Sequence, residues 1–212
     1  MRGGSWPACT LSRKSQLELR GISCLPLELC PPAKQETCVS RSFGRVVSSL
    51  PELKEALALR TTRLGEKLRA QRQAATSLQV FARTSAFDEN PYSNAVTVTL
   101  PTATNHTPAL LGHALRGTEA IFQAGYRFKK AGVIAMGLLP ETIEQGHLFE
   151  PPRDRQRDRE LMSVVDSLNR RFGSGTVGFA ASGMKRPWQM RCSRRSRRFT
   201  TRWDELQRVT AR

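Results

Sequence analysis

Between Ser77 and Leu100 the chain contains two runs in which apolar and polar residues alternate, separated by a polar turn over 88–91. An alternation with a period of two predicts β-strands, so we expect this stretch to form a hairpin. The apolar positions are Leu78, Val80, Ala82, Val96, Val98 and Leu100. They define one face that helices can cover, whereas the other face carries polar or small residues together with Phe81 and Arg83. A sheet with one open, weakly basic face suits an acidic partner.

Helix and strand patterns flank this hairpin on both sides. Thr37–Val47 suits a strand, and Ser49 with Glu52 resembles a capping box at the start of a helix. The apolar face of that helix comprises Leu53, Leu57, Leu64 and Leu68. A second helix is predicted from Thr107, and a further strand over 126–139. The order predicts an α+β fold of the ferredoxin-like βαββαβ type, with two helices on one side of a four-stranded sheet.

The rest of the chain predicts a linker and a small basic unit. Proline and charged residues dominate 140–158, as in a linker. A third amphipathic helix and then a short strand over 176–181 are expected after it. The apolar face predicted for this helix comprises Leu161, Val164, Val165, Leu168 and Phe172. From Gly183 onward there are ten Lys or Arg and two acidic residues, so this end supplies +8 of the chain's net charge of +16.

This charge balance points to an anionic partner. A net charge of +16 and a pI near 10.9 are typical of chains that meet nucleic acid or an anionic membrane surface. No apolar run has the length that spans a bilayer, and the first residues lack the apolar core of a signal peptide, so we expect a cytoplasmic chain. The five cysteines lack CxxC spacing and the three histidines are scattered, which disfavours a disulfide framework and a metal site.

Several motifs, in order, resemble a known family. They are SRSFG at 40–44, FARTSAF and PYSN in the hairpin, YRFKKAGV at 126–133, HLF at 147–149, RFGSGTVGFAASG, RPWQMR and FTTRWDEL. This set resembles the C-terminal half of the UmuC-type catalytic subunits of bacterial DNA polymerase V, which are Y-family translesion polymerases of the SOS response to DNA damage. The resemblance runs from about Gln16 to the end.

The resemblance implies a domain organisation and a function. It divides the chain into a disordered start with a remnant of an upstream thumb or linker (1–34), a little-finger domain that grips primer-template DNA (35–139), a linker (140–158) and a small UmuC-type C-terminal domain (159–212). In this family the catalytic carboxylates and their two Mg²⁺ ions belong to a palm that precedes the little finger. We therefore expect no catalysis and no cofactor in this chain, which would be a truncated or frameshifted product or the partner of a separately encoded catalytic half.

The DNA contacts expected from the resemblance lie at strand ends. Backbone N–H groups beside a glycine can approach phosphates, and cationic side chains add sequence-independent affinity. The candidate residues are Arg41, Ser42, Phe43, Gly44, Arg83, Thr84, Lys129 and Lys130. The alternative for each is a solvent-exposed position that keeps the chain soluble.

The segment EQGHLF resembles the bacterial sliding-clamp-binding motif. Leu148 and Phe149 would fill an apolar pocket on the clamp while the Gln145 amide binds its rim. Gly146 stands where the family often has leucine, which would lower the affinity. In the alternative interpretation Leu148 and Phe149 fold back onto their own domain. A UmuD-like subunit is a further partner that the family suggests.

Two other functions remain open at this point. The first is an RNA-binding or ribosome-associated module, in which Phe81 and Phe128 would stack on bases at the centre of the sheet. The second is an inactive gene remnant. Trp188 and Trp203 are interpreted as core residues of the small C-terminal unit and not as base-stacking groups.

Overall fold

The computed structural model describes residues 8–24, 34–142, 155–190, 196–207 and 209. The chain divides into two compact units, Met1–Lys34 and Gln35–Arg212. In the first unit, helix α1 spans Ala8–Leu19, where the sequence pattern predicts no ordered element. No helix in the described residues is both long and apolar enough to cross a membrane.

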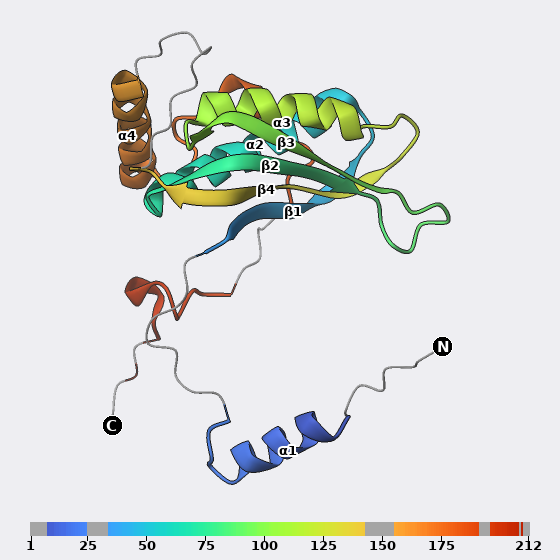
Figure 1. The fold of residues 1–212 in the computed structure, drawn as a ribbon, viewed down its shortest axis with the longest axis vertical. Helices are drawn as coiled ribbons and strands as arrows, with labels where there is room; N and C mark the ends of the chain where they lie inside the picture. The colour runs from blue at the N-terminus through green and yellow to red at the C-terminus, as the bar shows by residue number, and fades with distance from the viewer. Residues whose placement is uncertain (1–7, 25–33, 143–154, 191–195, 208, 210–212) are drawn as a thin grey trace. The chain divides into compact units, whose positions relative to one another are not determined.

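The second unit is built on the predicted βαββαβ order (Figure 1). Its elements are β1 (Glu36–Val47), α2 (Leu50–Ala70), β2 (Gln73–Arg83), β3 (Ser93–Thr104), α3 (Thr107–Ile121) and β4 (Phe128–Pro140). The strands form one sheet in the order β1-β4-β2-β3, and each neighbouring pair is antiparallel. Two central strands, β4 and β2, are thus flanked by β1 and β3 at the edges.

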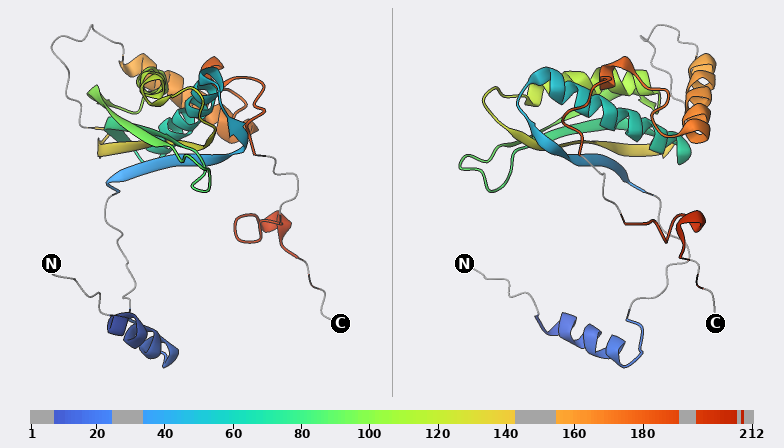
Figure 2. Two further views of the ribbon diagram at one scale, coloured as in Figure 1. Left: turned by 90° about the vertical axis from the view of Figure 1, so that its right-hand side faces the viewer. Right: turned by 180° about the vertical axis from the view of Figure 1, so that it is seen from behind.

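The register explains why one face is covered and the other is open. Leu78 lies opposite Ala135 and Val80 opposite Val133, and all four are buried completely. Helices α2 and α3 pack on this face, as the two views of Figure 2 show. The intervening residues, Gln79 and Phe81 among them, therefore point to the open face, as the alternation predicts.

Helix α2 buries the predicted apolar face but begins differently from the prediction. The four leucines of that face, Leu53, Leu57, Leu64 and Leu68, are all fully buried. Ser49 is the N-cap, yet its side chain forms no capping hydrogen bond. The predicted capping box is therefore wrong: the Glu52 carboxylate forms an ion pair with Arg45 of β1 instead. An acidic residue in the first turn still interacts favourably with the helix dipole.

The segment that follows the sheet contains α4 (Arg155–Phe172) and two short 3₁₀ turns, Ala180–Ser182 and Trp203–Glu205. The predicted strand over 176–181 is wrong, because both backbone groups of Val177 bond to the Asn169 amide at 2.9 Å and are not available for a ladder. Trp188 is completely buried in the same core as β1 and α2, where its ring meets Phe43 edge-on at 6.0 Å.

Helix α4 does not bury its predicted apolar face. Leu161, Val164 and Phe172 are 53–61% exposed, and the buried residues are Met162 and Asn169. The prediction fails because α2 and α3 already cover the sheet, so α4 meets them through a polar side of its own.

Candidate nucleic-acid interface

The open face of the sheet carries a basic row at one end. Lys130 of β4 lies opposite both Ser42 of β1 and Arg83 of β2, and Arg83 lies opposite Ser93 of β3. The four residues thus form a row across all four strands, with the two cations on adjacent central strands about 5 Å apart at the backbone. Lys129 is exposed, but as the neighbour of Lys130 in β4 it points away from this row. The structure therefore brings together Ser42, Arg83 and Lys130 from three separate predicted motifs.

Arg41 does not belong to this row. It lies opposite Ala131, which is buried under the helices, so alternation directs Arg41 toward the helix-covered side. Its charge also acts on Arg60 of α2, in agreement with this direction. Arg41 is exposed and Ser42 is half-buried, and the pairing with β4 places these neighbours on opposite faces.

Three of the candidate residues support the fold. Phe43 is only 2% exposed and packs against Trp188. The Gly44 N–H donates to the Trp188 carbonyl at 2.9 Å, so it does not face a ligand. Thr84 is buried, and its hydroxyl accepts a 2.8 Å hydrogen bond from the Tyr92 N–H across the base of the β2–β3 turn. These three residues position β1 and the hairpin, and contact with a partner is left to their exposed neighbours.

Phe81 crosses the open face above Gly132. A Cβ at position 132 would lie 2.7 Å from the Phe81 ring and 2.4 Å from Cβ of Ser40, so only glycine fits beneath the ring. Phe128, by contrast, is completely buried and meets Tyr92 and Phe122. The pair of stacking aromatics that the RNA-binding alternative needs is therefore not on one surface.

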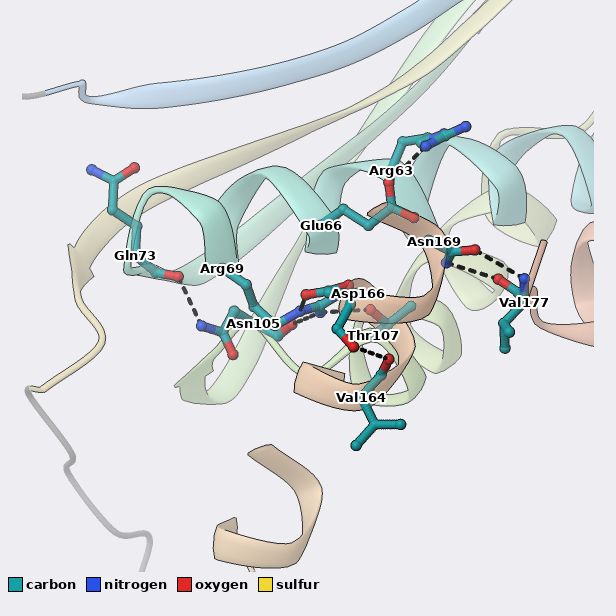
Figure 3. Close-up of polar contacts among 11 residues, drawn as sticks. Arg63, Glu66, Arg69, Gln73, Asn105, Thr107, Val164, Asp166, Asn169 and Val177 are labelled. Carbon is teal, nitrogen blue, oxygen red and sulfur yellow. Dashed lines mark hydrogen bonds and ion pairs between the residues drawn. The ribbon is translucent and has the colours of Figure 1, made fainter. Parts of the chain in front are cut away.

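A cleft that the sequence analysis did not find lies between α4 and the elements α2, α3 and β3. Its volume is about 1240 Å³. Figure 3 shows the polar contacts at this place. Across the cleft, the Arg69 guanidinium binds the Asp166 carboxylate through two hydrogen bonds of 2.6 and 2.8 Å. Arg69 also donates to the Asn105 carbonyl and to the Thr107 hydroxyl, each at 2.8 Å. A single arginine thus joins α2, α4 and the start of α3.

The two histidines at this cleft have neighbours of opposite charge. Burial, and then the charge of Arg116, lower the pKa of His113, whose Nδ1 lies 3.0 Å from the Arg116 guanidinium. His106 Nε2 lies 3.5 Å from an oxygen of Asp158 on α4. Among the residues that the structure describes, no three His, Cys, Asp or Glu side chains group together as a metal site would require.

The predicted clamp-binding residues Gln145, Leu148 and Phe149 fall within 143–154 and lie outside the described residues. The flanking elements are described: β4 ends at Pro140 and α4 begins at Arg155. The motif therefore belongs to the connection between the sheet and α4.

Comparison with known proteins identifies the family. Residues 34–148 match the impB/mucB/samB family C-terminal domain, and residues 159–209 match a domain of unknown function, DUF4113. Protein UmuC of Salmonella typhimurium is 38% identical over 91% of this chain and 46% of its own length. Protein MucB of Escherichia coli is 34% identical over 89% of this chain and 45% of its own length. DNA polymerase IV of Desulfatibacillum aliphaticivorans is 27% identical over 76% of this chain and 40% of its own length.

The chain thus spans about half the length of the UmuC-type relatives that it matches. Its family match contains all six elements of the βαββαβ unit, and the second match contains Trp188 and most of α4. The chain belongs to the impB/mucB/samB family and corresponds to the C-terminal portion of a Y-family polymerase.

Proposed function

We propose that this chain is the DNA-gripping, little-finger portion of a UmuC-type error-prone translesion polymerase that acts in DNA repair and the SOS response. The observation that carries the proposal is the open sheet face, with Arg83 and Lys130 side by side at one end. Helices cover the opposite face, so this surface has no partner within the sheet-and-helix unit. A cationic surface of this kind suits the phosphates of a duplex.

The contacts would position DNA without reading its sequence. Lys130 and Arg83 can reach phosphates as long, flexible cations, while Ser42 adds a hydroxyl in the same row. A polymerase that accepts any template needs such sequence-independent contacts, and base-specific hydrogen bonds would limit it. Affinity should accordingly fall steeply with salt, because each neutralised phosphate releases counterions.

Catalysis would reside in the part of the relatives that this chain does not match. The chain corresponds to under half of the length of Protein UmuC. We propose that the Mg²⁺-binding carboxylates of phosphoryl transfer come from a palm outside this sequence, in the same polypeptide or in a separate one. This chain would then hold no cofactor and would act at the nucleoid in the cytoplasm.

We also propose that the connection between β4 and α4 tethers the protein to a sliding clamp. The support is the sequence of that connection, with Gln145 followed by Leu148 and Phe149 at the spacing of a short peptide motif. Two adjacent apolar anchors in a linker suit a pocket on a partner. Replacing Leu148 and Phe149 with alanine should abolish clamp capture in a pull-down while duplex affinity stays unchanged. A UmuD-like subunit is a further candidate partner.

Fluorescence anisotropy with a labelled primer-template duplex across a salt series tests DNA binding. We expect the double variant Arg83→Ala, Lys130→Ala to weaken binding and to reduce the slope of log K against log salt by about 2, since two phosphate contacts are lost. Arg116→Ala on α3 removes a charge from the helix layer and serves as the control. Wild-type slopes in the double variant would contradict the proposal.

Single-stranded RNA as a competitor tests the alternative function. Displacement of duplex DNA by RNA at equal or lower concentration would favour an RNA-binding module. We expect RNA to displace the duplex only at higher concentration. Phe128 is buried, so Phe81 lacks the second stacking aromatic predicted for an RNA-binding site.

A further inference from the structure

Three arginines act through their charges on Arg60, which lies over the Trp188 ring. Arg60 and Arg63 lie on α2, Arg41 on β1, and Arg186 precedes Trp188 in the C-terminal segment. The Arg60 guanidinium lies over the Trp188 ring, 5.7 Å from its centroid. These four residues are called the arginine cluster below. They lie near the edge of the sheet, on the helix side, and are separate from the row of Arg83 and Lys130 on the open face.

Arg60 is buried without an acceptor. Only 8% of the residue is exposed, and its Nε is buried with no hydrogen-bond partner. Among the described residues Arg60 forms no ion pair, and its guanidinium lies over the Trp188 ring. Arg69 lies more than two turns further along α2 and is nearly as buried. Its guanidinium binds a carboxylate and two further oxygens. An unpaired buried guanidinium is costly, so its retention calls for an anion.

The positively charged neighbours of Arg60 make an anion at this position more favourable. Burial first, and then the charges of Arg41, Arg186 and Arg63, lower the pKa of Arg60 to about 10, so it is still a cation at neutral pH. Arg63 is paired with Glu66, and the Arg186 Nε donates to the carbonyls of Ser182 and Gly183. Those backbone bonds hold the Arg186 side chain in place near Arg60. Three further cations thus act on the position of Arg60.

We infer that the arginine cluster binds a phosphate group of nucleic acid, with Arg60 at its base and Arg41 and Arg186 at its rim. Guanidinium groups present N–H donors in a planar fork that matches phosphate oxygens, and several cations around one position favour an oxyanion. Arg41 adjoins Ser42, which belongs to the basic row of the open face. A strand that leaves that face over the edge strand β1 would bring its backbone to the cluster.

This inference rests on the proposed DNA-binding function and adds a second point of contact to it. The occupant is a phosphodiester of the bound nucleic acid, and free inorganic phosphate, which shares the same chemistry, is the other source to be distinguished. Trp188 supplies a local sensor, because an anion bound at Arg60 changes the charge directly above the indole ring.

The experiment uses the full chain with Trp6→Phe and Trp203→Phe, which leaves Trp188 as the only tryptophan. Primer-template duplex and inorganic phosphate are titrated separately while Trp188 emission and, for the labelled duplex, anisotropy are recorded. We expect the duplex to change Trp188 emission with the same midpoint as the anisotropy. Millimolar inorganic phosphate should change the emission in the same direction only weakly.

Arg60→Met is the decisive variant. We expect it to reduce the slope of log K for the duplex against log salt by about 1 and to abolish the emission change. The melting temperature of the free protein should be unchanged or higher, because an apolar side chain of similar length replaces an unpaired buried charge. Arg186→Ala, whose side chain is partly exposed, repeats the binding test if Arg60→Met fails to fold. Arg116→Gln on α3 controls for the loss of one positive charge.

The outcomes separate this inference from the proposed function. Duplex binding with unchanged Trp188 emission and a wild-type salt slope in Arg60→Met would overturn the phosphate site while DNA binding stands. A strong response to inorganic phosphate with none to duplex would overturn the assignment to nucleic acid. Failure of the wild-type chain to bind duplex even at low salt would overturn both.

Discussion

The ion pair between Arg69 and Asp166 connects α4 to the sheet-and-helix unit, and its removal should weaken the docking of that helix. The two side chains are 12% and 16% exposed and share two hydrogen bonds. Asp166→Asn keeps the shape of the side chain but removes its charge. A hydrogen bond to a charged group contributes about 1.5–3 kcal/mol to stability. Removing one partner of a nearly buried pair costs more, because it leaves the other charge without compensation. With some solvent access, we expect a loss of about 2 kcal/mol.

Native-state hydrogen exchange measures this loss where it occurs. An isolated 18-residue helix is marginal in water, so amides of α4 should exchange when the helix undocks. A loss of about 2 kcal/mol corresponds to exchange about 30-fold faster in Asp166→Asn. Amides of β2 and β4 should keep their wild-type rates, because the sheet does not depend on this pair.

Glu119→Gln is the matched control. Glu119 also pairs with a residue of α2, Lys54 at 2.5 Å, but it is 54% exposed. An exposed pair contributes under about 1 kcal/mol, so exchange should change little. Wild-type exchange of α4 in Asp166→Asn would refute the reasoning, as would equal acceleration in the sheet, which would mean that the pair stabilises the whole unit.

Three further changes test the packing and the charge of the second unit. Gly132→Ala should destabilise it by about 1–3 kcal/mol in urea, because the new methyl group overlaps the Phe81 ring, and an unchanged midpoint would show that the ring moves freely. Gly44→Ala places Cβ 2.8 Å from the Gln189 carbonyl oxygen and should increase proteolysis of the C-terminal segment; resistance equal to wild type would contradict this contact. His113→Gln should flatten the acid side of the stability profile: burial lowers the folded-state pKa, so the unfolded chain takes up the proton first and stability falls as pH drops below about 6.5. A pH profile of stability identical to that of the wild type would show that His113 does not contribute to the loss of stability in acid.

The alternation in the hairpin was sufficient to predict the faces of β2 and β3. Leu78, Val80 and Ala82 are all buried as expected, because a period of two has one geometric meaning in a strand. The leucine face of α2 was predictable for the same kind of reason. The order of elements along the chain, however, does not determine which strands are neighbours in space, so the β1-β4-β2-β3 order came from the structure.

Pattern alone failed where burial depends on a distant partner. The apolar face of α4 is evident in the sequence, but periodicity does not say whether another element covers it, and Leu161 and Val164 are exposed. The basic row needed the register between β2 and β4 to bring Arg83 to Lys130. Arg60 carried no signal at all, since its burial depends on Trp188, far along the chain.

The contact between Trp188 and β1 also bears on aggregation. β1 is an edge strand, and edge strands with free N–H and C=O groups recruit other chains. The Trp188 carbonyl takes the Gly44 N–H, and the backbone of Gln189 and Met190 lies close against that glycine. A protein cut at residue 148, where the match to the impB/mucB/samB domain ends, would lose the segment that covers β1. It would also expose Phe43. Segments that belong to two family matches can thus share one cooperative folding reaction, and a soluble fragment should extend through Met190.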